Sequence, residues 1–411
     1  MRVIIVGSKF WPEYAGSSNR IFNTYKRLSE NQRDLDISII TGSTEFNWPT
    51  RYKWQGYRVV RLACPIPRLR GLIGRILLAL EQYLVAGMAI LALTCRQRPD
   101  VIHVYGTSSA VAMAILWASV WRIPLMIELV TDGARPWQQL PGLRYRSSLR
   151  LDKGTVITAI SEQLAEACAE QYLTDNVWAR PNPVDLERFY PVDQATRNAI
   201  RTKISPFKEG DIVLVAVAKI MPQKNQIFLI SVLPHLPERY KLLLAGPLVK
   251  QGPLAARDMG CFEEMQCEIE RQGLSNRCHI QTGFVNTADY VKASDVYLMP
   301  SMQEGLGTPM LESLACAVPV VANADVPAFT QWINQGENGF LCKLNPFVWS
   351  QAVVLASELS PEARHLAAER VGVLSGAASI DESFLKLMKH LSENNVESPI
   401  SVHSILERNA G

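Results

Sequence analysis

The sequence predicts two doubly wound α/β domains, each with a largely parallel sheet between layers of helices. The chain has 411 residues, which exceeds the roughly 250 to 300 residues at which a single hydrophobic core stops growing. Short β-branched runs alternate with amphipathic segments along the chain, as in parallel sheets flanked by helices. The alternation stops once, at a proline-rich segment near the middle, and then restarts. These observations favour two sheets of the same type.

The first domain is expected over residues 1–183. Its predicted strands are RVIIV, DISII, YRVVRL, DVIHV, PLMIELV and TVITAI, each followed by a turn or a helical segment. Ser17 or Ser18 is the candidate N-cap of the first helix. The inward face of that helix has i, i+4, i+7 spacing: Ile21, Tyr25 and Leu28. The apolar stretch at residues 83–95 is shorter than the roughly 18 uncharged residues that cross a bilayer, so we expect a buried helix there.

The proline-rich break predicts the boundary between the domains. Prolines remove backbone donors from the segment RPNPVDLERFYPVD, so we place the linker at residues 184–193. The second domain is expected over residues 194–375, with strands DIVLVAVAK, YKLLLAG, CHIQTG, DVYLMP, VPVVA and GFLC. Residues 376–411 are expected to form a C-terminal helix that packs back towards the first domain, followed by a polar tail. Ligands of such sheets bind outside the carboxyl ends of the strands, so we expect a ligand in a cleft between the two domains.

The composition excludes several classes of protein. Hydrophobic residues make up 48% of the chain and charged residues 20%, which excludes a disordered or fibrous protein. A formal net charge of +3 is too small for a protein that holds nucleic acid mainly by neutralising phosphates, so no nucleic-acid partner is expected. The eight cysteines include no C-x-x-C pair and no histidine at zinc-ligand spacing. We interpret them as reduced core thiols of a cytoplasmic protein, and the N-terminal apolar run is too short for a secretory signal.

The most informative segment is DVYLMPSMQEGLGTPMLESLACAVPVVAN, residues 295–323. A strand is followed by a glycine-rich turn and a short helix, for which Thr308 is a suitable N-cap and Pro309 a suitable first residue. Gly305 and Gly307 allow the backbone to turn sharply and its amides to approach a ligand. The N-terminus of the helix that follows attracts phosphate.

Glu304 and Glu312 bracket this turn, with seven residues between them. On spacing alone, Glu312 can complement the helix dipole and Glu304 can be a solvated loop charge. However, PSMQEGLGTPMLESLACAVPVV resembles the signature of retaining glycosyltransferases of the GT4 family, which have the GT-B fold and the pattern P-S-x-x-E-G-x-G-x-P-x-x-E. The resemblance implies that Glu312 holds the ribose hydroxyls of a nucleotide. It also implies that Glu304 holds the donor sugar together with the backbone at Gly305, Leu306 and Gly307.

A second segment carries two cations around one loop. In VAVAKIMPQKNQIFLISVL, residues 215–233, a strand ends at Lys219 and a helix starts just after Lys224. Two basic side chains and a helix N-terminus can stabilise a departing diphosphate without a metal ion, although for any isolated pair of lysines a solvated surface is the favoured interpretation. The segment resembles the family's G-R-x-x-x-x-K-G loop, with Lys219 at the usual arginine. This replacement removes bidentate geometry from the contact with phosphate.

Two shorter segments resemble the same family. The loop FWPEYAGSSNR resembles the P-x-x-G-G loop that touches the diphosphate and the acceptor, with Gly16 present and Ala15 in place of the first glycine. The string PNPVDLERFYP resembles P-N-G-V-D-x-x-x-F-x-P, with Pro183 in place of glycine. The four matches span most of the chain in the family's order. They imply a GT-B fold, in which two Rossmann-like domains, for the acceptor and the nucleotide sugar, face an interdomain cleft.

The largest departure from the family lies in PLMIELVTDGARPW, residues 124–137. Many members carry a histidine that contacts the donor sugar in the slot that Val130 occupies here. Asp132 can hydrogen-bond a sugar hydroxyl or assist the acceptor, or it can cap a turn before Gly133, and both interpretations stay open. We interpret His103 as a structural histidine rather than an acceptor contact. The family's later G-G-x-x-E motif is not recognisable in NADVPAF.

The resemblance implies a retaining glycosyltransferase that moves a sugar from a nucleoside diphosphate sugar to a saccharide or lipid-linked acceptor in the synthesis of a polysaccharide, glycan or glycolipid. The residues expected to carry catalysis are Glu304, Lys224, Lys219 and Asp132. No carboxylate pair can be assigned as the nucleophile and acid of a double displacement, so front-face substitution is implied. No cofactor and no metal are expected. The alternatives are a sugar-nucleotide epimerase of the same architecture and a non-catalytic nucleotide-sugar binding protein, which the Val130 slot favours.

A basic patch lies in the first domain. No acidic residue occurs between Glu45 and Glu81, and seven basic residues fall within that stretch: Arg51, Lys53, Arg58, Arg61, Arg68, Arg70 and Arg75. With the neighbouring apolar helix, the patch suggests contact with an anionic membrane surface or a lipid-linked acceptor, as in a protein bound to the inner face of the membrane. A core-facing helix with a solvated basic face explains the same pattern.

Overall fold

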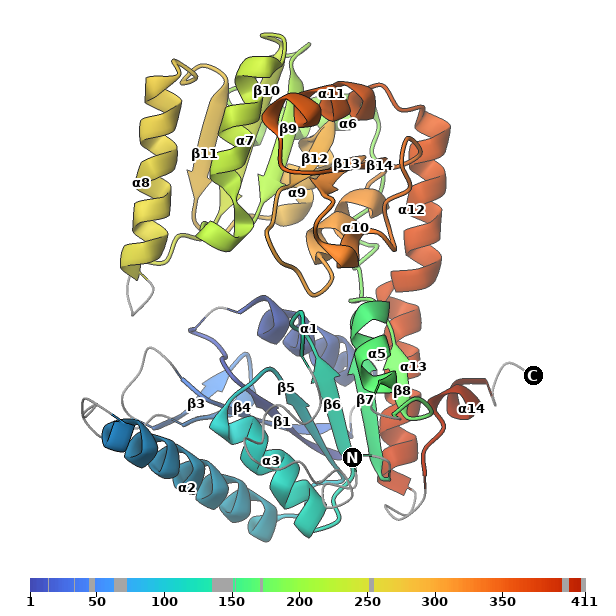
Figure 1. Ribbon diagram of the computed structural model, residues 1–411. Helices are drawn as coiled ribbons and strands as arrows, with labels where there is room; N and C mark the ends of the chain where they lie inside the picture. Colours follow the sequence, from blue (N-terminus) through green and yellow to red (C-terminus); the bar gives the residue numbers. More distant parts are fainter. Residues whose placement is uncertain are drawn as a thin grey trace. The chain divides into compact units, whose positions relative to one another are not determined.

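The structure is a computed structural model of the whole chain, Met1–Gly411. It describes all residues except 14, 33, 44–48, 63–71, 135–150, 152, 171–172, 251–254, 394–398 and 408–411, and it leaves out the side chains of 72–79, 81 and 82. The chain forms two compact units. The first unit comprises Met1–Pro181 and Ala378–Gly411, and the second comprises Asn182–Ala377 (Figure 1).

The described part of the first unit contains an eight-stranded sheet in the order β3-β4-β2-β1-β5-β6-β7-β8. Its strands are β1 (Arg2–Gly7), β2 (Asp36–Thr41), β3 (Thr50–Trp54), β4 (Tyr57–Arg61), β5 (Val101–Tyr105), β6 (Leu125–Leu129), β7 (Thr155–Ala159) and β8 (Val177–Ala179). Its helices are α1 (Gly16–Asn31), α2 (Leu72–Arg96), α3 (Ser109–Val120), α5 (Glu162–Ala169), α13 (Ala377–Glu393) and α14 (Val402–Glu407). The paired strands run parallel, except for the antiparallel hairpin β3–β4.

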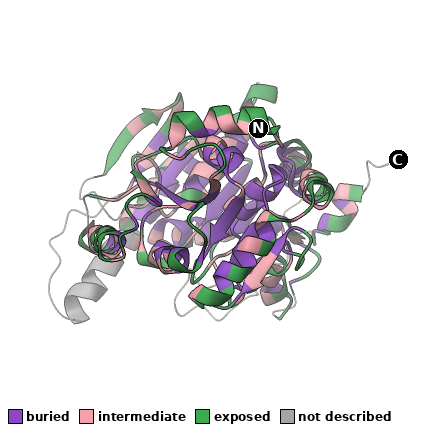
Figure 2. Ribbon diagram, turned by 90° about the horizontal axis from the view of Figure 1, so that it is seen from above, coloured by how far each residue is buried: buried purple, intermediate pink, exposed green. Residues whose placement is uncertain are grey.

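The two faces of this sheet are covered by different helices. Helices α1, α13 and α14 pack on one face, where the predicted inward positions Ile21, Tyr25 and Leu28 are buried against Phe384 and Leu387 of α13. Helix α3 packs against β1 and β5, and α2 packs on α3. Figure 2 shows buried residues concentrated in the strands and exposed residues on the outer sides of the helices. The first unit is therefore the layered α/β domain that the sequence predicts.

Several local expectations for the first unit are wrong. Neither Ser17 nor Ser18 is the N-cap of α1, which begins at Gly16 after Ala15, because the Ser18 hydroxyl donates instead to the Lys9 carbonyl at 2.5 Å. Strand β3 was not predicted from the sequence; it joins β4 through a two-residue turn with positive φ at Gln55 and Gly56.

The apolar helix α2 is not fully buried. Leu80, Leu84 and Met88 are more than half exposed and lie one turn apart, so they form an outward stripe. Over the described residues, no helix has the length and hydropathy needed to cross a membrane. The C-terminal tail also contains a helix that was not predicted, α14, whose Val402 and Ile405 are buried in the core of the first unit.

The second unit contains a parallel sheet, described as six strands in the order β11-β10-β9-β12-β13-β14. Its strands are β9 (Ile212–Val217), β10 (Tyr240–Gly246), β11 (Cys278–Thr282), β12 (Val296–Met299), β13 (Val320–Asn323) and β14 (Gly339–Cys342). Its helices are α6 (Gln194–Ile204), α7 (Gln226–Val232), α8 (Ala255–Arg271), α9 (Thr287–Ala293), α10 (Thr308–Ala315), α11 (Pro346–Ser357) and α12 (Pro361–Ser375). Short 3-10 turns are η1 (Pro222–Lys224), η2 (Leu233–His235) and η3 (Pro327–Phe329). Each of the six strands predicted for this half is present.

The topology of the second unit fixes where a ligand site is expected. The chain runs outwards from the central strand β9 to β10 and β11, and then returns to place β12 on the other side of β9. Helices α7, α8 and α11 pack around the core on one face, while α9 and α10 contact β9 and β12. The strand order therefore reverses between β9 and β12, which is the switch point of a doubly wound sheet.

The cysteines match the prediction only in part. Seven of the eight are described, and Cys168, Cys261, Cys278, Cys316 and Cys342 are buried as expected. Cys95 and Cys267 are exposed, so the interpretation as core thiols is wrong for these two, which lie on the outer faces of α2 and α8. Cys64 lies outside the described residues.

Candidate functional site at the switch point of the second sheet

Two loops that carry predicted site residues meet at the carboxyl edge of β9 and β12. These strands pair in parallel, with Leu214 opposite Val296 and Val215 opposite Tyr297. The Tyr297 hydroxyl ties the end of β9 to β12, because it accepts from the Val217 amide and donates to the Val217 carbonyl, both at 3.0 Å. The loop after β9 holds the two predicted lysines, and the loop after β12 holds the glycine-rich turn. Both therefore lie where doubly wound sheets bind ligands.

Direct contacts join the two loops. The Met302 amide donates to the Gln223 carbonyl at 2.9 Å, and the Gln223 side-chain amide donates to the Gln303 carbonyl at 2.9 Å. The Lys224 ammonium donates to Glu304 Oε1 in a short ion pair. The side chains of Lys224 and Glu304 are 22% and 13% exposed, so the pair is partly shielded from water. Two residues predicted to contact different parts of a donor are thus paired with each other.

Lys219 follows β9 and forms an ion pair that the sequence analysis did not predict. Its ammonium lies 2.9 Å from Asp258 Oδ2 on α8. Asp258 is fully buried, whereas the Lys219 side chain is 21% exposed. The partners are far apart in the sequence, and no motif includes Asp258, so no sequence signal could have paired them.

The turn before α10 depends on Gly307. This residue has a φ of +86°, and a Cβ placed on it would lie 2.6 Å from Phe329 Cε1 and 2.9 Å from Met299 Cε. Glycine is therefore required by conformation and by space. Gly307 also occupies the N-cap position of α10, so the expectation that Thr308 is the N-cap is wrong by one residue. Leu306 is 1% exposed, side chain and backbone together, so this residue lies in the core of the second unit.

Thr308 is instead bound to the start of the second unit. Its hydroxyl accepts a hydrogen bond of 2.6 Å from the Asn182 side-chain amide. Asn182 belongs to the PNPVD string, is 6% exposed, and has no hydrogen-bond partner for its Oδ1 among the described residues. The string that resembles a family motif therefore supports the first turn of α10.

Glu312 lies one turn into α10 and keeps only partial exposure. Burial raises the pKa of the Glu312 carboxyl to about 8, while the charge of Arg188 acts in the opposite direction. The charge of Asp185 adds to the increase in this pKa. Glu312 is thus mostly protonated at neutral pH in the free protein. A partly buried acid with a raised pKa beside a glycine-rich turn is typical of a functional site.

Gly16 and Asp132, the other predicted site residues, belong to the first unit. A Cβ placed on Gly16 would meet no atom within 4 Å among the described residues, so no described neighbour requires glycine there. Asp132 lies in a turn closed by a hydrogen bond of 2.9 Å from the Ala134 amide to the Thr131 carbonyl, and its Oδ1 accepts from the Gln163 side chain at 3.4 Å. Asp132 thus lies in a turn before Gly133, and both its role as a cap and its role towards an acceptor stay predictions.

Beside the Val130 slot, the first unit contains a buried charged cluster. Glu128 accepts from Arg180 Nη2 at 2.8 Å and forms an ion pair with Arg20 at 2.7 Å, and His103 Nε2 lies 3.2 Å from its Oε2. Burial raises the pKa of Glu128, but the arginine charges outweigh burial and hold this pKa well below its ordinary range. His103 Nδ1 is bonded to the Tyr25 hydroxyl at 2.9 Å. His103 is thus the structural histidine that the sequence analysis favoured, and the sequence analysis missed both arginines.

The NADVPAF segment, in which no family motif was recognisable, supports the turn before α10. The Asn323 side-chain amide donates to the Ser301 carbonyl at 3.1 Å. Phe329 of η3 occupies the space beside Gly307. The segment therefore supports the loop between β12 and α10 through these two contacts.

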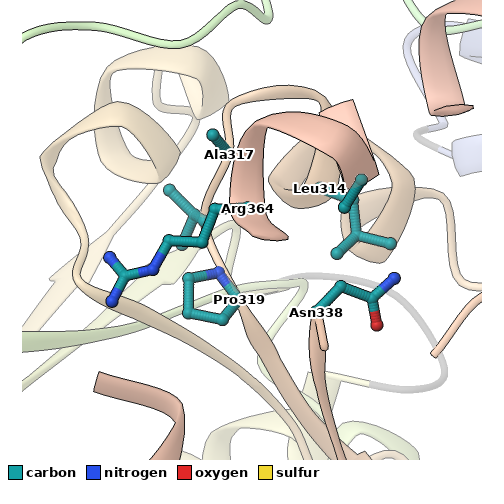
Figure 3. Close-up of a pocket in the computed structure, with 7 residues that line it drawn as sticks. Leu314, Ala317, Pro319, Asn338 and Arg364 are labelled. Carbon is teal, nitrogen blue, oxygen red and sulfur yellow. The ribbon is translucent and has the colours of Figure 1, made fainter. Parts of the chain in front are cut away.

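A small surface hollow, too narrow to hold a water molecule, lies elsewhere in the second unit (Figure 3). It is lined by Leu314, Ala317, Val318, Pro319, Asn338, Arg364 and Ala367. Leu314 and Ala317 lie at the C-terminal end of α10, whereas the glycine-rich turn lies at its N-terminal end. The hollow is therefore separate from the predicted site. Among the described residues, no group of three or more His, Cys, Asp or Glu side chains is arranged to hold a metal ion.

The basic patch is described only in part. Arg51, Lys53 and Arg58 are exposed on the β3–β4 hairpin, and Arg58 pairs with Asp36 at 2.8 Å. Arg61 is buried, with its guanidinium over the Tyr52 ring. Arg68, Arg70 and the side chain of Arg75 lie outside the described residues.

Comparisons with known proteins agree on one family. Residues 198–369 match the model of glycosyl transferases group 1, and residues 16–183 match the glycosyl transferase 4-like domain. A D-inositol 3-phosphate glycosyltransferase of Xylanimonas cellulosilytica is 28% identical over 214 residues, which cover 51% of this chain and 48% of the relative. The UDP-Gal:alpha-D-GlcNAc-diphosphoundecaprenol alpha-1,3-galactosyltransferase of Escherichia coli is 23% identical over 195 residues, covering 46% of this chain and 48% of the relative. The chain thus spans about half the length of these curated relatives.

The fold is shared with solved structures. The crystal structure of HepE from Anabaena in complex with UDP-glucose has a TM-score of 0.67 at 14% identity, and the match covers 95% of this chain and 99% of that one. At this identity the likeness shows the fold alone, which is GT-B, with two parallel-sheet α/β units. The two family models between them match most of both units. The chain therefore belongs to the group 1 (GT4) family of glycosyltransferases.

Proposed function

We propose that this protein is a retaining glycosyltransferase that transfers a sugar from a nucleoside diphosphate sugar to a saccharide or lipid-linked hydroxyl in glycan or glycolipid synthesis. The observation that carries the proposal is the meeting of Lys219, Lys224, Glu304 and the Gly307 turn at the switch point of the second sheet. Two relatives support the substrate classes by their names, one through a UDP-sugar donor with a diphosphoundecaprenol acceptor and one through an inositol phosphate acceptor. The UDP-glucose complex of HepE supports the same donor class.

Each residue of the site has a proposed role towards the donor. Lys219 and Lys224 bind the diphosphate together with amides at the N-terminus of α10, where the helix dipole favours an anion. Glu312 binds the ribose hydroxyls. Glu304 and the backbone from Gly305 to Gly307 bind the sugar.

Donor binding must open the ion pair between Lys224 and Glu304. Once the pair has opened, Lys224 turns to the diphosphate and Glu304 turns to the sugar hydroxyls. The two residues then contact the donor on either side of the bond between the sugar and the diphosphate. The electrostatic contribution of such a cation grows as negative charge accumulates on the departing diphosphate. The ion pair therefore keeps both groups in place before the donor arrives.

The reaction proceeds by substitution on the face of the sugar that the diphosphate leaves. The bond between the anomeric carbon and the diphosphate oxygen breaks, the acceptor oxygen bonds to the same carbon, and a diphosphate oxygen takes the acceptor proton. Lys219 and Lys224 carry the charge of the leaving group, so metal independence is part of the proposal. Gly16 and Asp132 of the first unit are the proposed contacts to the diphosphate and the acceptor.

Product analysis with EDTA present tests this function. UDP-, GDP- and ADP-sugars are incubated with the protein and with inositol phosphate or a lipid-diphosphate-linked saccharide, and the nucleotide and the product are followed by chromatography and NMR. Release of nucleoside diphosphate together with a product that keeps the donor's anomeric configuration is expected. An altered donor without any acceptor indicates an epimerase, and donor binding without turnover indicates a binding protein. An inverted product contradicts retention, and loss of turnover in EDTA contradicts metal independence.

A further inference from the structure

The backbone around Lys219 is held from several sides. The Gln226 side chain, which is 2% exposed, donates to the Lys219 carbonyl at 2.9 Å. The next amide, of Ile220, donates to the Pro247 carbonyl at 3.0 Å. Gly246 at the end of β10 comes so close that a Cβ on it would lie 1.9 Å from the Ala218 carbonyl oxygen. The start of the loop after β9 is therefore fixed before any ligand binds.

The side chain of Lys219 is held as well, by Asp258. Asp258 Oδ1 accepts from Arg257 Nε at 2.9 Å and from Arg257 Nη2 at 2.6 Å. Asp258 Oδ2 is left facing the Lys219 ammonium at 2.9 Å, and no other hydrogen-bond partner for it occurs among the described residues. One fully buried carboxylate thus joins the loop after β9 to α8.

A simpler explanation is that Asp258 complements the dipole at the start of α8. An acid with that role alone gains nothing from leaving water, and a buried carboxylate is costly unless it is paired. Asp258 has no exposed surface, yet the Lys219 side chain keeps 21% of its exposure. The Lys219 side chain is therefore held but not fully covered, and Asp258 uses one of the three N–H donors of its ammonium.

Residue 219 is a lysine rather than an arginine, and this difference explains why its side chain needs a partner that orients it. An arginine grips phosphate with a rigid planar fork, whereas a lysine is a point charge on a flexible four-carbon stem that loses rotamer freedom on binding. We propose that Asp258 is a positioning residue, which fixes the Lys219 ammonium in the orientation that binds the donor diphosphate. This inference rests on the proposed function. It explains how a lysine serves at this position without a fork of its own.

For Asp258→Asn, positioning and a simple charge effect predict opposite changes in the affinity for nucleoside diphosphate. Asp258→Asn removes a negative charge beside a lysine that binds diphosphate, so Coulomb attraction alone predicts tighter binding of nucleoside diphosphate. Loss of positioning predicts weaker binding, by about tenfold if the stem regains most of its freedom. It also predicts a lower kcat, because a misplaced ammonium stabilises the leaving group less.

The experiment is calorimetric titration with UDP, GDP and ADP, each alone, together with kcat and KM measured for the donor that binds. The variants are Asp258→Asn, Lys219→Ala and the double variant, and the matched control is Glu268→Gln, which removes a charge from the last turns of the same helix. Weaker binding in Asp258→Asn, wild-type binding in Glu268→Gln, and a double variant no weaker than Lys219→Ala are expected.

Unchanged or tighter binding in Asp258→Asn overturns the proposal, and so do additive losses in the double variant. If Asp258→Asn does not fold, Asp258→Glu keeps the charge but moves the carboxylate by one methylene. Severalfold weaker binding is then expected, and wild-type affinity overturns the proposal. A wild-type protein that binds none of the three nucleotides refutes the proposed function itself, and the inference falls with it. Normal wild-type binding that only Lys219→Ala weakens refutes the role of Asp258 alone.

Discussion

The raised pKa of Glu312 gives donor binding a defined dependence on pH. The ribose hydroxyls of a nucleotide donate hydrogen bonds, and only the ionised carboxylate accepts on both oxygens. With a pKa of about 8, about 1% of Glu312 is ionised in the free protein at pH 6 and about half at pH 8. If the donor selects the ionised form, its apparent affinity rises roughly 50-fold over this range and levels off above it. Glu312→Gln removes the titrating group, so this variant is expected to bind weakly and without that dependence.

The assay is calorimetric titration of an ADP-sugar, a GDP-sugar and a UDP-sugar at half-unit steps from pH 6 to 8, with circular dichroism at each pH to show that the protein stays folded. Wild-type affinity that does not change with pH refutes the assignment of the ribose contact to an ionised Glu312. If the affinity of Glu312→Gln for the donor still changes with pH in the same way, another group causes the pH dependence, and the reasoning from the burial of Glu312 fails.

Three further predictions concern stability and the glycines. Between pH 4.5 and about 8 the folded protein keeps a proton on Glu312 that the unfolded chain has released, so the free energy of unfolding should fall as pH rises through this window. In Glu312→Gln, the melting temperature should depend less on pH over the same window. Gly307→Ala is expected to destabilise the second unit by about 2 to 4 kcal/mol in urea denaturation, because it combines a positive φ with a Cβ against Phe329, and wild-type stability would contradict the geometry of the turn. Gly16→Ala adds a Cβ in open space at the start of α1, so its melting temperature should match the wild type or exceed it while donor turnover falls; unchanged turnover removes Gly16 from the site.

Much of the fold could be predicted because strand patterns and turn chemistry are local. Each of the six strands of the second unit follows from a short run of apolar or β-branched residues, and the inward face of α1 follows from helical spacing. The hairpin strand β3 was missed because TRYKW is polar and sits at a sheet edge, where alternation is weak. The N-cap of α1 was misplaced because a tertiary contact, from Ser18 to the Lys9 carbonyl, uses the hydroxyl that capping would need.

The candidate site divides in the same way between local and distant relations. Lys219, Lys224, Glu304 and Gly307 lie within motifs, and the parallel pairing of β9 with β12 brings their loops together. Contacts between loops and helices could not be predicted. The ion pair of Lys219 with Asp258 and the bond from Asn182 to Thr308 join residues far apart in the sequence, and no periodic pattern relates them.

The central claim is that the loops after β9 and β12 bind the diphosphate and the sugar of the donor. A crystal structure of the protein with a bound nucleoside diphosphate sugar, or with the nucleoside diphosphate alone, tests it most directly. The account predicts phosphate oxygens within hydrogen-bonding distance of the Lys219 and Lys224 ammonium groups, ribose hydroxyls on Glu312, and a Lys224 that has left Glu304. A nucleotide bound away from these loops, or an ion pair between Lys224 and Glu304 that stays closed beside the bound donor, would contradict it.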